Sequence, residues 1–528
     1  MPSLEDIMHL LNGARGGDVF DGLRAGFLVL LALAVAGVAW PARGAGPRRA
    51  GLLAAGLWAA LAAVLAHQAL WQLAGFRRPE FVRFIRFHDP RPDAALKQVQ
   101  RGQILDWRGT VLAATDVADP WHRIYPLGPA ACHVVGYLHP RYGMAGVERA
   151  ADPTLCGYSF RNLGDLDRFG RNLVDHRGAR GGDVRLTLDA ELQRAAAGLL
   201  AGRAGAAVVL RPDDGSLLAL ASAPVFDPQN PGAALSDAAG APLLNRATQG
   251  LYPPGSTFKI LLAGMAAERR LAPRLRCPGE GFAPVPGTRP IRDSEYYVCL
   301  REGRAWPGFG RIGLRDGFVH SSNVYFAQLA LLLGAERFDA IAERNRLRER
   351  VVCFDGPAAA LATEPGRLPA ASPAQRRELA QRAIGQGDFL VTPLHVALWT
   401  AAVAAHGRMW QPRLAADAPP LLLGHTMPAA AADTVRDLMR ESVRYGTGRA
   451  ADIPRLAVCG KTGTAEAPGG TEHSWFTCFA PAGRPELVVT VLIEHGGYGA
   501  RSAAPVARGI LEAAVELGLA GEDPRETK

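Results

Sequence analysis

Two long apolar stretches open the chain, at about residues 23–40 and 50–76, and a short arginine-containing link separates them. A helix needs about 20 apolar residues to cross a bilayer, and both stretches are long enough. A cleaved signal peptide has a single apolar core, so the second stretch favours two transmembrane helices within residues 23–76 after a tail of residues 1–22. Buried core helices are the alternative, but uncharged runs this long are unusual in soluble domains.

After the apolar stretches the sequence turns polar and rich in Gly, Pro and Arg, with short extended segments such as residues 102–113. We interpret residues 77–200 as a non-catalytic platform or linker module. At the end of this module and just past it, residues 186–203 have apolar positions at helical spacing. Residues 205–222 then show the pattern of two strands joined at Asp214-Gly215, a pair typical of hairpin turns.

Three strand-like runs lie late in the chain, separated by Gly/Pro-rich turns, at residues 456–466, 473–481 and 486–495. Mostly helical segments lie between the two groups of strands, among them residues 256–270 and 322–334. The pattern predicts an α/β fold, in which an antiparallel sheet is flanked by helices, for a main domain of residues 201–520.

Composition supports a folded protein of several domains, because the chain has 528 residues of which 48% are hydrophobic. Its net charge of +9 raises the question of a nucleic-acid partner. No helix-turn-helix, zinc-finger spacing or aromatic-basic motif accompanies the charge. We therefore expect a solvated basic surface and no nucleic acid.

Lysine is rare in this chain. Of 59 basic residues, four are lysines, so arginine occupies nearly every ordinary cationic position. Arginine stays protonated in proteins, whereas a buried lysine loses its proton readily. An internal lysine here is therefore a candidate for chemistry that requires an amine base. The four are Lys97, Lys259, Lys461 and Lys528.

The seven cysteines form no CxxC pair, and HExxH is absent, so the sequence predicts neither a zinc site nor a thioredoxin-like motif. In an oxidising compartment Cys277 and Cys299 are the first candidates for a disulfide, because they bracket a Pro/Gly-rich loop. Small buried thiols are an equally good interpretation.

The first chemical motif is PPGSTFKI, in which a Pro/Gly turn leads into a helix carrying Ser256 and Lys259 in its first turn. Residues three apart share a helix face. A desolvated amine can therefore act as the base that a weak serine nucleophile needs. Taken alone, the pattern also fits an ordinary helix start with a solvated lysine.

Two companion motifs change that balance. Ser321-Ser322-Asn323 sets a hydroxyl and a carboxamide two residues apart, and Lys461-Thr462-Gly463-Thr464 sets a cation and two hydroxyls on a predicted strand. Gly463 lets a ligand backbone approach that strand and dock along its edge. Lys461 would attract a carboxylate and lower the pKa of Lys259, while Thr462 and Thr464 supply hydrogen bonds.

In this order, Ser-x-x-Lys, Ser-x-Asn and Lys-Thr-Gly resemble the motifs of penicillin-binding proteins and serine β-lactamases. From about Arg101 onward, the chain is similar to class B penicillin-binding proteins, the monofunctional transpeptidases. Supporting blocks are RGQILDWRGTVLA, RIYPLGPAACHVVGY, GDVRLTLDAELQ and AIGQGDFLVTPLHVA. Three features depart from the family pattern: Gly308 to Gly310 read GFG where many relatives have Gly-His-Gly, Trp107 stands where arginine is usual, and the predicted anchor has two spans instead of one.

The resemblance implies a penicillin-binding fold and acyl transfer from a D-Ala-D-Ala stem peptide of peptidoglycan through Ser256, with β-lactams as covalent inhibitors. Lys259 would take the serine proton, Ser321 would relay it and Asn323 would hold the substrate amide. The N–H groups of Ser256 and Thr464 would form the oxyanion hole. Lys461, Thr462 and Thr464 would bind the terminal carboxylate, beside Gly463.

The resemblance also implies a setting. We expect a protein of the cytoplasmic membrane with an external catalytic domain, hence an external N-terminus, and no metal or organic cofactor. A polytopic membrane glycosyltransferase of the rod-shape or division machinery is the expected partner. His473 is either a substrate contact or a structural histidine.

The sequence leaves two alternatives open. A β-lactamase needs a base for hydrolysis of the acyl-enzyme, and Glu364 is the one tempting candidate, although its surroundings favour a structural turn. A non-catalytic β-lactam sensor or scaffold of the cell wall would use the same pocket only for binding, but all the motif residues are present.

Overall fold

The computed structural model describes residues 55–56, 58–66, 99–116, 122–157, 179–370, 374–467 and 470–523. The chain forms two units, Met1–Ala95 and Leu96–Lys528. In the first unit, residues 55–56 and 58–66 are helical. The predicted tail and most of the two predicted spans lie outside the described residues. Among the helices that are described, none combines the length and hydropathy of a membrane span.

A five-stranded antiparallel sheet organises the second unit, in the strand order β10-β9-β19-β18-β17. The predicted hairpin at Asp214-Gly215 is confirmed: Gly215 has φ +75°, and the Asp214 carboxylate accepts from Ser216 N at 2.8 Å. The three late strands are confirmed as well. The strands are β9 (Gly205–Leu210), β10 (Leu217–Ala223), β17 (Cys459–Ala465), β18 (His473–Ala480) and β19 (Leu487–Ile493).

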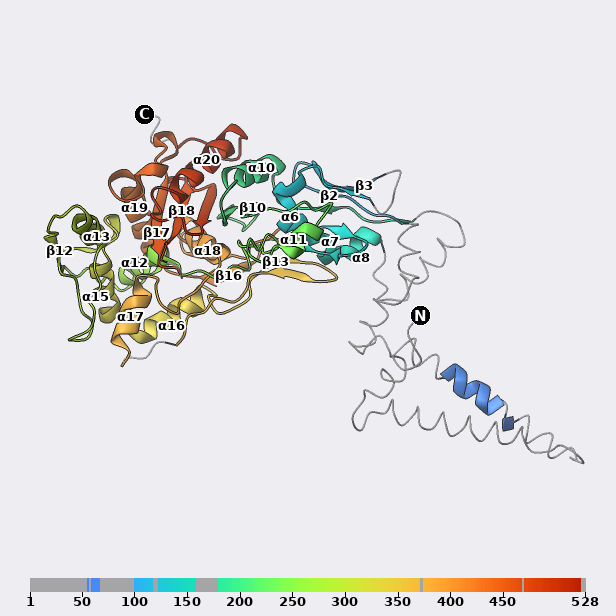
Figure 1. Ribbon diagram of the computed structural model, residues 1–528, viewed down its shortest axis with the longest axis horizontal. Helices are drawn as coiled ribbons and strands as arrows, with labels where there is room; N and C mark the ends of the chain where they lie inside the picture. Colours follow the sequence, from blue (N-terminus) through green and yellow to red (C-terminus); the bar gives the residue numbers. More distant parts are fainter. Residues whose placement is uncertain are drawn as a thin grey trace, which may run out of the picture. The chain divides into compact units, whose positions relative to one another are not determined.

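Helices cover both faces of this sheet, so the α/β prediction is confirmed (Figure 1). Ala207 and Val209 of β9 pack toward α10 (Ala190–Leu199) and α20 (Ala503–Glu516). Their neighbours Val208 and Leu210 face the opposite core, because side chains alternate along a strand. That core includes α12 (Lys259–Glu268) and α18 (Pro393–Ala404).

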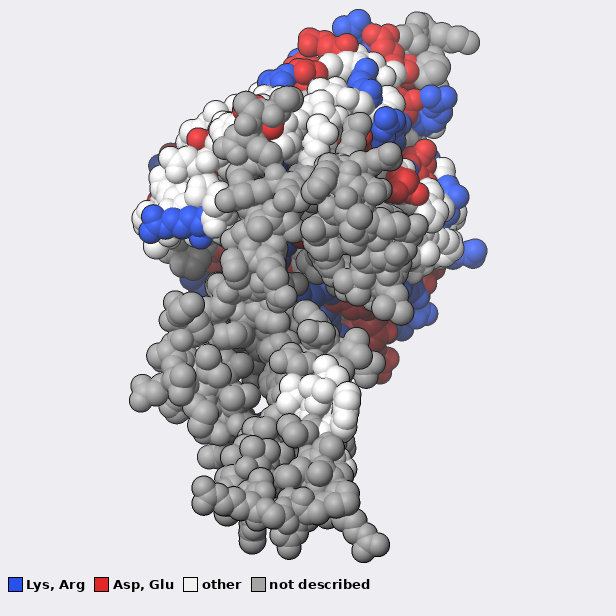
Figure 2. Space-filling model, turned by 90° about the vertical axis from the view of Figure 1, so that its right-hand side faces the viewer, with Lys and Arg blue, Asp and Glu red and all other residues white. Residues whose placement is uncertain are grey.

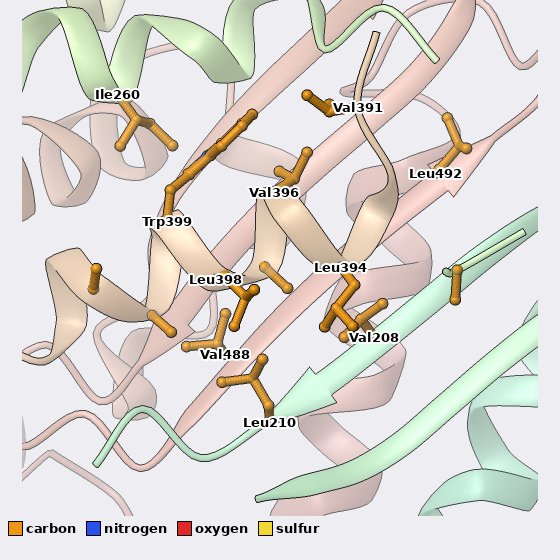
Figure 3. Close-up of a cluster of buried hydrophobic side chains, with 14 of the residues drawn as sticks. Val208, Leu210, Ile260, Val391, Leu394, Val396, Leu398, Trp399, Val488 and Leu492 are labelled. Atoms are coloured by element: carbon orange, nitrogen blue, oxygen red, sulfur yellow. The ribbon is translucent and has the colours of Figure 1, made fainter. Parts of the chain in front are cut away.

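Helix α18 forms the centre of the second core, and each of its residues is buried. Figure 3 shows Leu394, Val396, Leu398 and Trp399 of this helix between the strands β9 and β19 and the helix α12. A helix that is apolar all round is expected only inside a protein. Helix α18 thus packs against the sheet and against α12, the helix that follows the Ser256 turn.

Residues 99–116, 122–157 and 179–188 form a smaller module, with a four-stranded sheet in the order β4-β3-β2-β8. A buried carboxylate, Glu148, ties it together: Oε2 accepts from Arg101 Nε at 2.9 Å and Oε1 from Arg123 Nε at 2.8 Å. Its elements are β1 (Val99–Gln100), β2 (Ile104–Leu105), β3 (Val111–Thr115), β4 (Arg123–Ile124), η2 (Gly128–Ala131), α6 (Cys132–Val135), β5 (Leu138–His139), β6 (Gly143–Met144), α7 (Gly146–Ala150), α8 (Asp152–Cys156), β7 (Ala179–Arg180) and β8 (Val184–Arg185).

The predicted helix within residues 186–203 begins at Ala190, because Asp189 caps it by accepting from Leu192 N at 3.0 Å. Helix α10 then packs on β10 and α20. The module boundary at residue 200 stays a prediction.

Further helices and short strands surround the sheet. They are α11 (Gly232–Ser236), η3 (Gly255–Phe258), β11 (Leu275–Pro278), α13 (Ser294–Arg301), β12 (Gly308–Ile312), α14 (Leu314–Val319), α15 (Asn323–Leu333), α16 (Ala335–Arg344), β13 (Val352–Asp355), β14 (Ala360–Ala362), α17 (Arg376–Ala383), β15 (Arg408–Trp410), β16 (Leu422–His425), α19 (Ala429–Tyr445), η4 (Arg449–Ala451) and η5 (Pro454–Leu456).

The expected disulfide does not form. All seven cysteines are buried and none is in a disulfide, Cys277 and Cys299 included. The pairing was therefore wrong, and the alternative of small buried thiols is confirmed. On the face that Figure 2 shows, basic side chains lie among acidic ones, so the positive charge visible there is not gathered into one patch.

Candidate active site

Ser256 lies in the 3-10 turn η3, which two glycines fix in place. Gly255 has φ +55°, and its N–H donates to Gly385 O at 3.0 Å. A Cβ atom on Gly385 would lie 2.1 Å from Gly255 O, so a side chain is excluded there. A Cβ atom on Gly255 would lie 2.6 Å from Thr464 O. The turn therefore holds the half-buried Ser256 against β17.

Lys259 is the first residue of α12 and is fully buried. Its Nζ donates to Ser321 O and to Asn323 Oδ1, both at 2.7 Å, and lies 3.4 Å from Ser321 Oγ. These acceptors, rather than Ser256 Oγ, hold the amine in this structure. The first two predicted motifs thus meet at one ammonium group.

Ser321 is one of the few non-glycine residues with a positive φ, at +57°. This backbone conformation is costly for a residue with a side chain and persists where the surroundings impose it. Asp293 supplies that support from before α13: its Oδ1 accepts from Ser322 Oγ at 3.0 Å and from Val324 N at 3.1 Å. Asn323 is held in turn by Nδ2 donating to Arg292 O at 3.0 Å.

Lys461 contacts the Ser321 hydroxyl from strand β17, whereas Lys259 contacts it from helix α12. It is fully buried on β17, the edge strand of the sheet, and its Nζ donates to Ser321 Oγ at 2.7 Å and to Thr462 O at 3.2 Å. The Ser321 hydroxyl therefore lies between two buried lysine amines, although Lys259 and Lys461 are about 200 residues apart in sequence.

Both amines are easier to deprotonate than an ordinary lysine. Burial lowers the pKa of Lys259 to about 7, against smaller opposing effects of Asp293 and Glu295. Burial and then repulsion from Lys259 lower the pKa of Lys461 well below its usual value. From the sequence we expected Lys461 to lower the pKa of Lys259, but burial is the main cause. Near neutral pH, the pair can supply a free amine.

The three other predicted residues of β17 also lie at the site. Thr462 Oγ1 is 2.6 Å from Thr447 Oγ1, and Thr464 Oγ1 accepts from Gly499 N at 3.4 Å. A Cβ atom on Gly463 would lie 2.8 Å from Trp475 Cβ and 2.9 Å from Thr257 Cγ2. The structure therefore explains this glycine by close packing against η3, where the sequence suggested only room for a ligand.

Sequence reasoning missed two groups in this site. Asp293 supports the Ser321-to-Asn323 segment, and Thr447, in the turn after α19, contacts Thr462. Asp293 stands immediately before α13, a position typical of a helix cap, but its side chain makes no cap hydrogen bond. Its contacts with residues about 30 positions further along the chain carried no local signal.

His473 and Glu364 hold structural contacts. His473 is buried on β18, its Nδ1 accepts from His495 N at 3.2 Å, and burial lowers its pKa. Glu364 Oε1 pairs with Arg350 Nη2 at 2.5 Å. Neither residue contacts the two lysines.

Two of the departures from the family pattern lie among the described residues and have identifiable contacts. Phe309 stacks on His320 with ring centroids 5.1 Å apart, next to Ser321. Trp107 Nε1 donates at 2.8 Å to Asp189, the cap of α10. Within the described ranges no three metal-ligating side chains gather, and the absence of a cofactor stays a prediction.

Comparison with known proteins places these features in a family. Residues 205–512 match the penicillin binding protein transpeptidase domain, and residues 101–181 match the penicillin binding protein A dimerisation domain. The peptidoglycan D,D-transpeptidase PbpA of Mycobacterium tuberculosis is 32% identical over 476 residues, which cover 81% of this chain and 92% of that protein.

Solved structures agree. The D,D-transpeptidase domain of a peptidoglycan glycosyltransferase from Eggerthella lenta is 31% identical with a TM-score of 0.68, covering 80% of this chain and 99% of that one. The imipenem acyl-enzyme complex of penicillin-binding protein A from M. tuberculosis is 28% identical with a TM-score of 0.68 and the same coverage. The chain therefore belongs to the penicillin-binding protein transpeptidase family, within class B.

Proposed function

We propose that this chain is a serine-type peptidoglycan D,D-transpeptidase that forms its acyl-enzyme on Ser256. The observation that carries the assignment of roles is the position of Ser321 Oγ, at 2.7 Å from Lys461 Nζ and 3.4 Å from Lys259 Nζ. This arrangement offers a route for a proton between a base and a leaving group. A binding scaffold would not need two buried amines with lowered pKa values.

In the proposed acylation step, neutral Lys259 accepts the Ser256 hydroxyl proton while Oγ bonds to the carbonyl carbon of the penultimate D-Ala. The bond from that carbon to the terminal D-Ala nitrogen then breaks. Ser321 gives its proton to this nitrogen and regains one from the lysine pair, so that D-Ala leaves as an amine. An amine of a second stem peptide takes the place of D-Ala in the reverse sequence, which forms the cross-link and frees Ser256.

The edge of β17 is the proposed docking line for the donor peptide. This strand has β18 on one side only, so its other edge is available for strand addition. Lys461, Thr462 and Thr464 would bind the terminal carboxylate beside Gly463, and the arriving negative charge would favour the charged form of Lys461. The N–H groups of Ser256 and Thr464 would bind the oxyanion, worth about 3 kcal/mol each in other serine enzymes.

The cellular setting is a proposal of the same kind. Apolar residues 23–40 and 50–76 would anchor the chain in the cytoplasmic membrane, with the catalytic domain outside. A polytopic glycosyltransferase of the rod-shape or division machinery would be contacted through the anchor and the module of residues 77–200. β-Lactams would occupy the site as stable acyl-enzymes, as imipenem does in the M. tuberculosis protein.

Covalent labelling of the full chain in detergent by a fluorescent penicillin tests the proposal. We expect a long-lived adduct that Ser256→Ala abolishes, because the nucleophile is gone. Ser236→Ala, in the short helix α11, is the matched control and should label normally. Release of the label within seconds would indicate a β-lactamase instead, and an unlabelled but folded wild type would exclude an acyl-enzyme.

A further inference from the structure

A contact between Arg301 and Tyr498 joins two segments that the proposed chemistry does not use. Arg301 ends α13, and Tyr498 lies in the loop between β19 and α20. Arg301 Nη2 donates to the Tyr498 hydroxyl at 3.0 Å, and the guanidinium carbon lies 6.0 Å from the centre of the ring. The contact fixes a cation that is itself exposed to solvent.

On the Arg301 side, hydrogen bonds connect the start of α13 to the segment that follows Ser321 in the site. Asp293, immediately before α13, holds Ser322 and Val324, and Glu295 in its first turn influences the pKa of both lysines. Helix α13 has eight residues and is therefore about 12 Å long. Arg301 thus lies at the far end of α13 from Asp293, a length of about three extended peptide residues.

On the Tyr498 side, the loop that carries this residue packs against strand β17 of the site. Ser474 Oγ donates to Tyr498 O at 3.4 Å, and Gly499 N donates to Thr464 Oγ1 at 3.4 Å. A Cβ atom on Gly499 would lie 2.6 Å from Gly463 O, so this loop is packed directly on the strand. The Arg301–Tyr498 contact therefore links the α13 side of the site to the β17 side, away from the catalytic groups.

Arg301 differs in its charge balance from Arg304 and Arg315. Arg304 pairs with Glu302, and Arg315 pairs with Glu441. Among the described residues no carboxylate lies within salt-bridge distance of Arg301. The Tyr498 hydroxyl, which accepts from Arg301, keeps its own hydrogen for another acceptor. Arg301 and Tyr498 together therefore present an oriented cation and a hydrogen-bond donor, and no carboxylate of the described residues neutralises them.

We infer that Arg301, positioned by Tyr498, binds a side-chain carboxylate of the donor peptide, on a residue preceding D-Ala-D-Ala. The inference rests on the proposed function, because the peptide must lie along β17. A guanidinium held in one orientation can form a charge-assisted pair with such a carboxylate. The site would then recognise the stem peptide at both ends of the bound segment, through its terminal carboxylate and through this second one.

The test compares two acyl donors of equal length that end in D-Ala-D-Ala, with either a free carboxylate or a carboxamide on the side chain of the preceding residue. Release of D-Ala gives kcat/KM for each. We expect the wild-type chain to favour the carboxylate by about tenfold, a preference that declines as salt is added. Arg301→Ala should abolish the preference, and Arg301→Lys should keep part of it.

Two further variants separate recognition from general damage. Tyr498→Phe should reduce the preference by about twofold to threefold, since it removes one hydrogen bond but keeps the ring. Arg304→Ala, the matched control, should leave it intact. Equal rates for the two donors in the wild type, or a full preference in Arg301→Ala, would overturn the inference. Penicillin labelling of the wild type decides the proposed function separately.

Discussion

Among the described residues, two clusters of charged and polar side chains differ in how their charges are balanced. In the module of residues 99–188, the platform cluster comprises Arg101, Arg123, Glu148 and Asp152, in which each guanidinium meets Glu148. In the main domain, the catalytic cluster comprises Lys259, Ser321, Asn323 and Lys461, in which two amines share one hydroxyl.

The difference decides what each cluster can do. Opposite charges in contact favour the charged forms, and Glu148 with its neighbours keeps the pKa of Arg101 raised although burial acts against it. Burial without a carboxylate in contact favours loss of a proton, and it lowers the pKa of both lysines, with repulsion from Lys259 adding to the effect on Lys461. The first cluster can only hold structure, whereas the second can exchange protons near neutral pH.

The largest expected effect is a loss of activity without a loss of stability, when Lys259 of the catalytic cluster is replaced. Lys259→Met removes the base while filling its space, so penicillin acylation should slow by about a thousandfold. The melting temperature should change little, because the lost hydrogen bonds are offset by removal of a buried charge beside Lys461. Stopped-flow labelling and thermal unfolding measure the two quantities. A large loss of stability would show that Lys259 holds the fold as Glu148 does.

The reverse pattern is expected in the platform cluster. Glu148→Gln leaves a buried guanidinium without its counter-charge, which costs about 3 kcal/mol, or roughly a hundredfold in local opening. Hydrogen exchange of the amides in residues 99–157 measures this opening. Glu191→Gln, on the exposed pair with Arg194, is the control and should cost under about 0.5 kcal/mol. Unchanged exchange in Glu148→Gln would contradict the comparison.

The sequence predicted the components of the catalytic cluster because each motif is local. Ser256 and Lys259 are three residues apart, and strand alternation marked β9, β10 and the late strands. It did not predict what supports them. Asp293 and Tyr498 act through contacts with distant segments, and no short-range pattern distinguishes them from surface polar residues.

The same limit explains the errors. A Pro/Gly-rich loop between Cys277 and Cys299 suggested a disulfide, but spacing along the chain does not show whether two buried thiols face each other. For Gly463 the residue was identified correctly and the reason was incomplete, because the packing of Thr257 and Trp475 depends on the folded turn.

A smaller effect concerns the pH dependence of acylation. Lys259 is active as a base only when neutral, and its pKa of about 7 implies that the acylation rate is full above this pH. Below it the rate should fall by about tenfold per pH unit, since the neutral fraction declines in that proportion. A rate that is constant from pH 5.5 to 9 would remove Lys259 as the base.

Asp293→Asn sharpens this prediction because it changes a charge and little else. The asparagine Oδ1 can still accept from Ser322 and Val324, so the plateau rate should fall only severalfold. The negative charge of Asp293 raises the pKa of Lys259, so its removal should move the acidic limb of the profile to lower pH. Asp293→Ala, which also removes the acceptor, should lower the plateau further. An unmoved limb in Asp293→Asn would mean that Asp293 is already protonated in the wild type, which is the direction in which burial shifts its pKa.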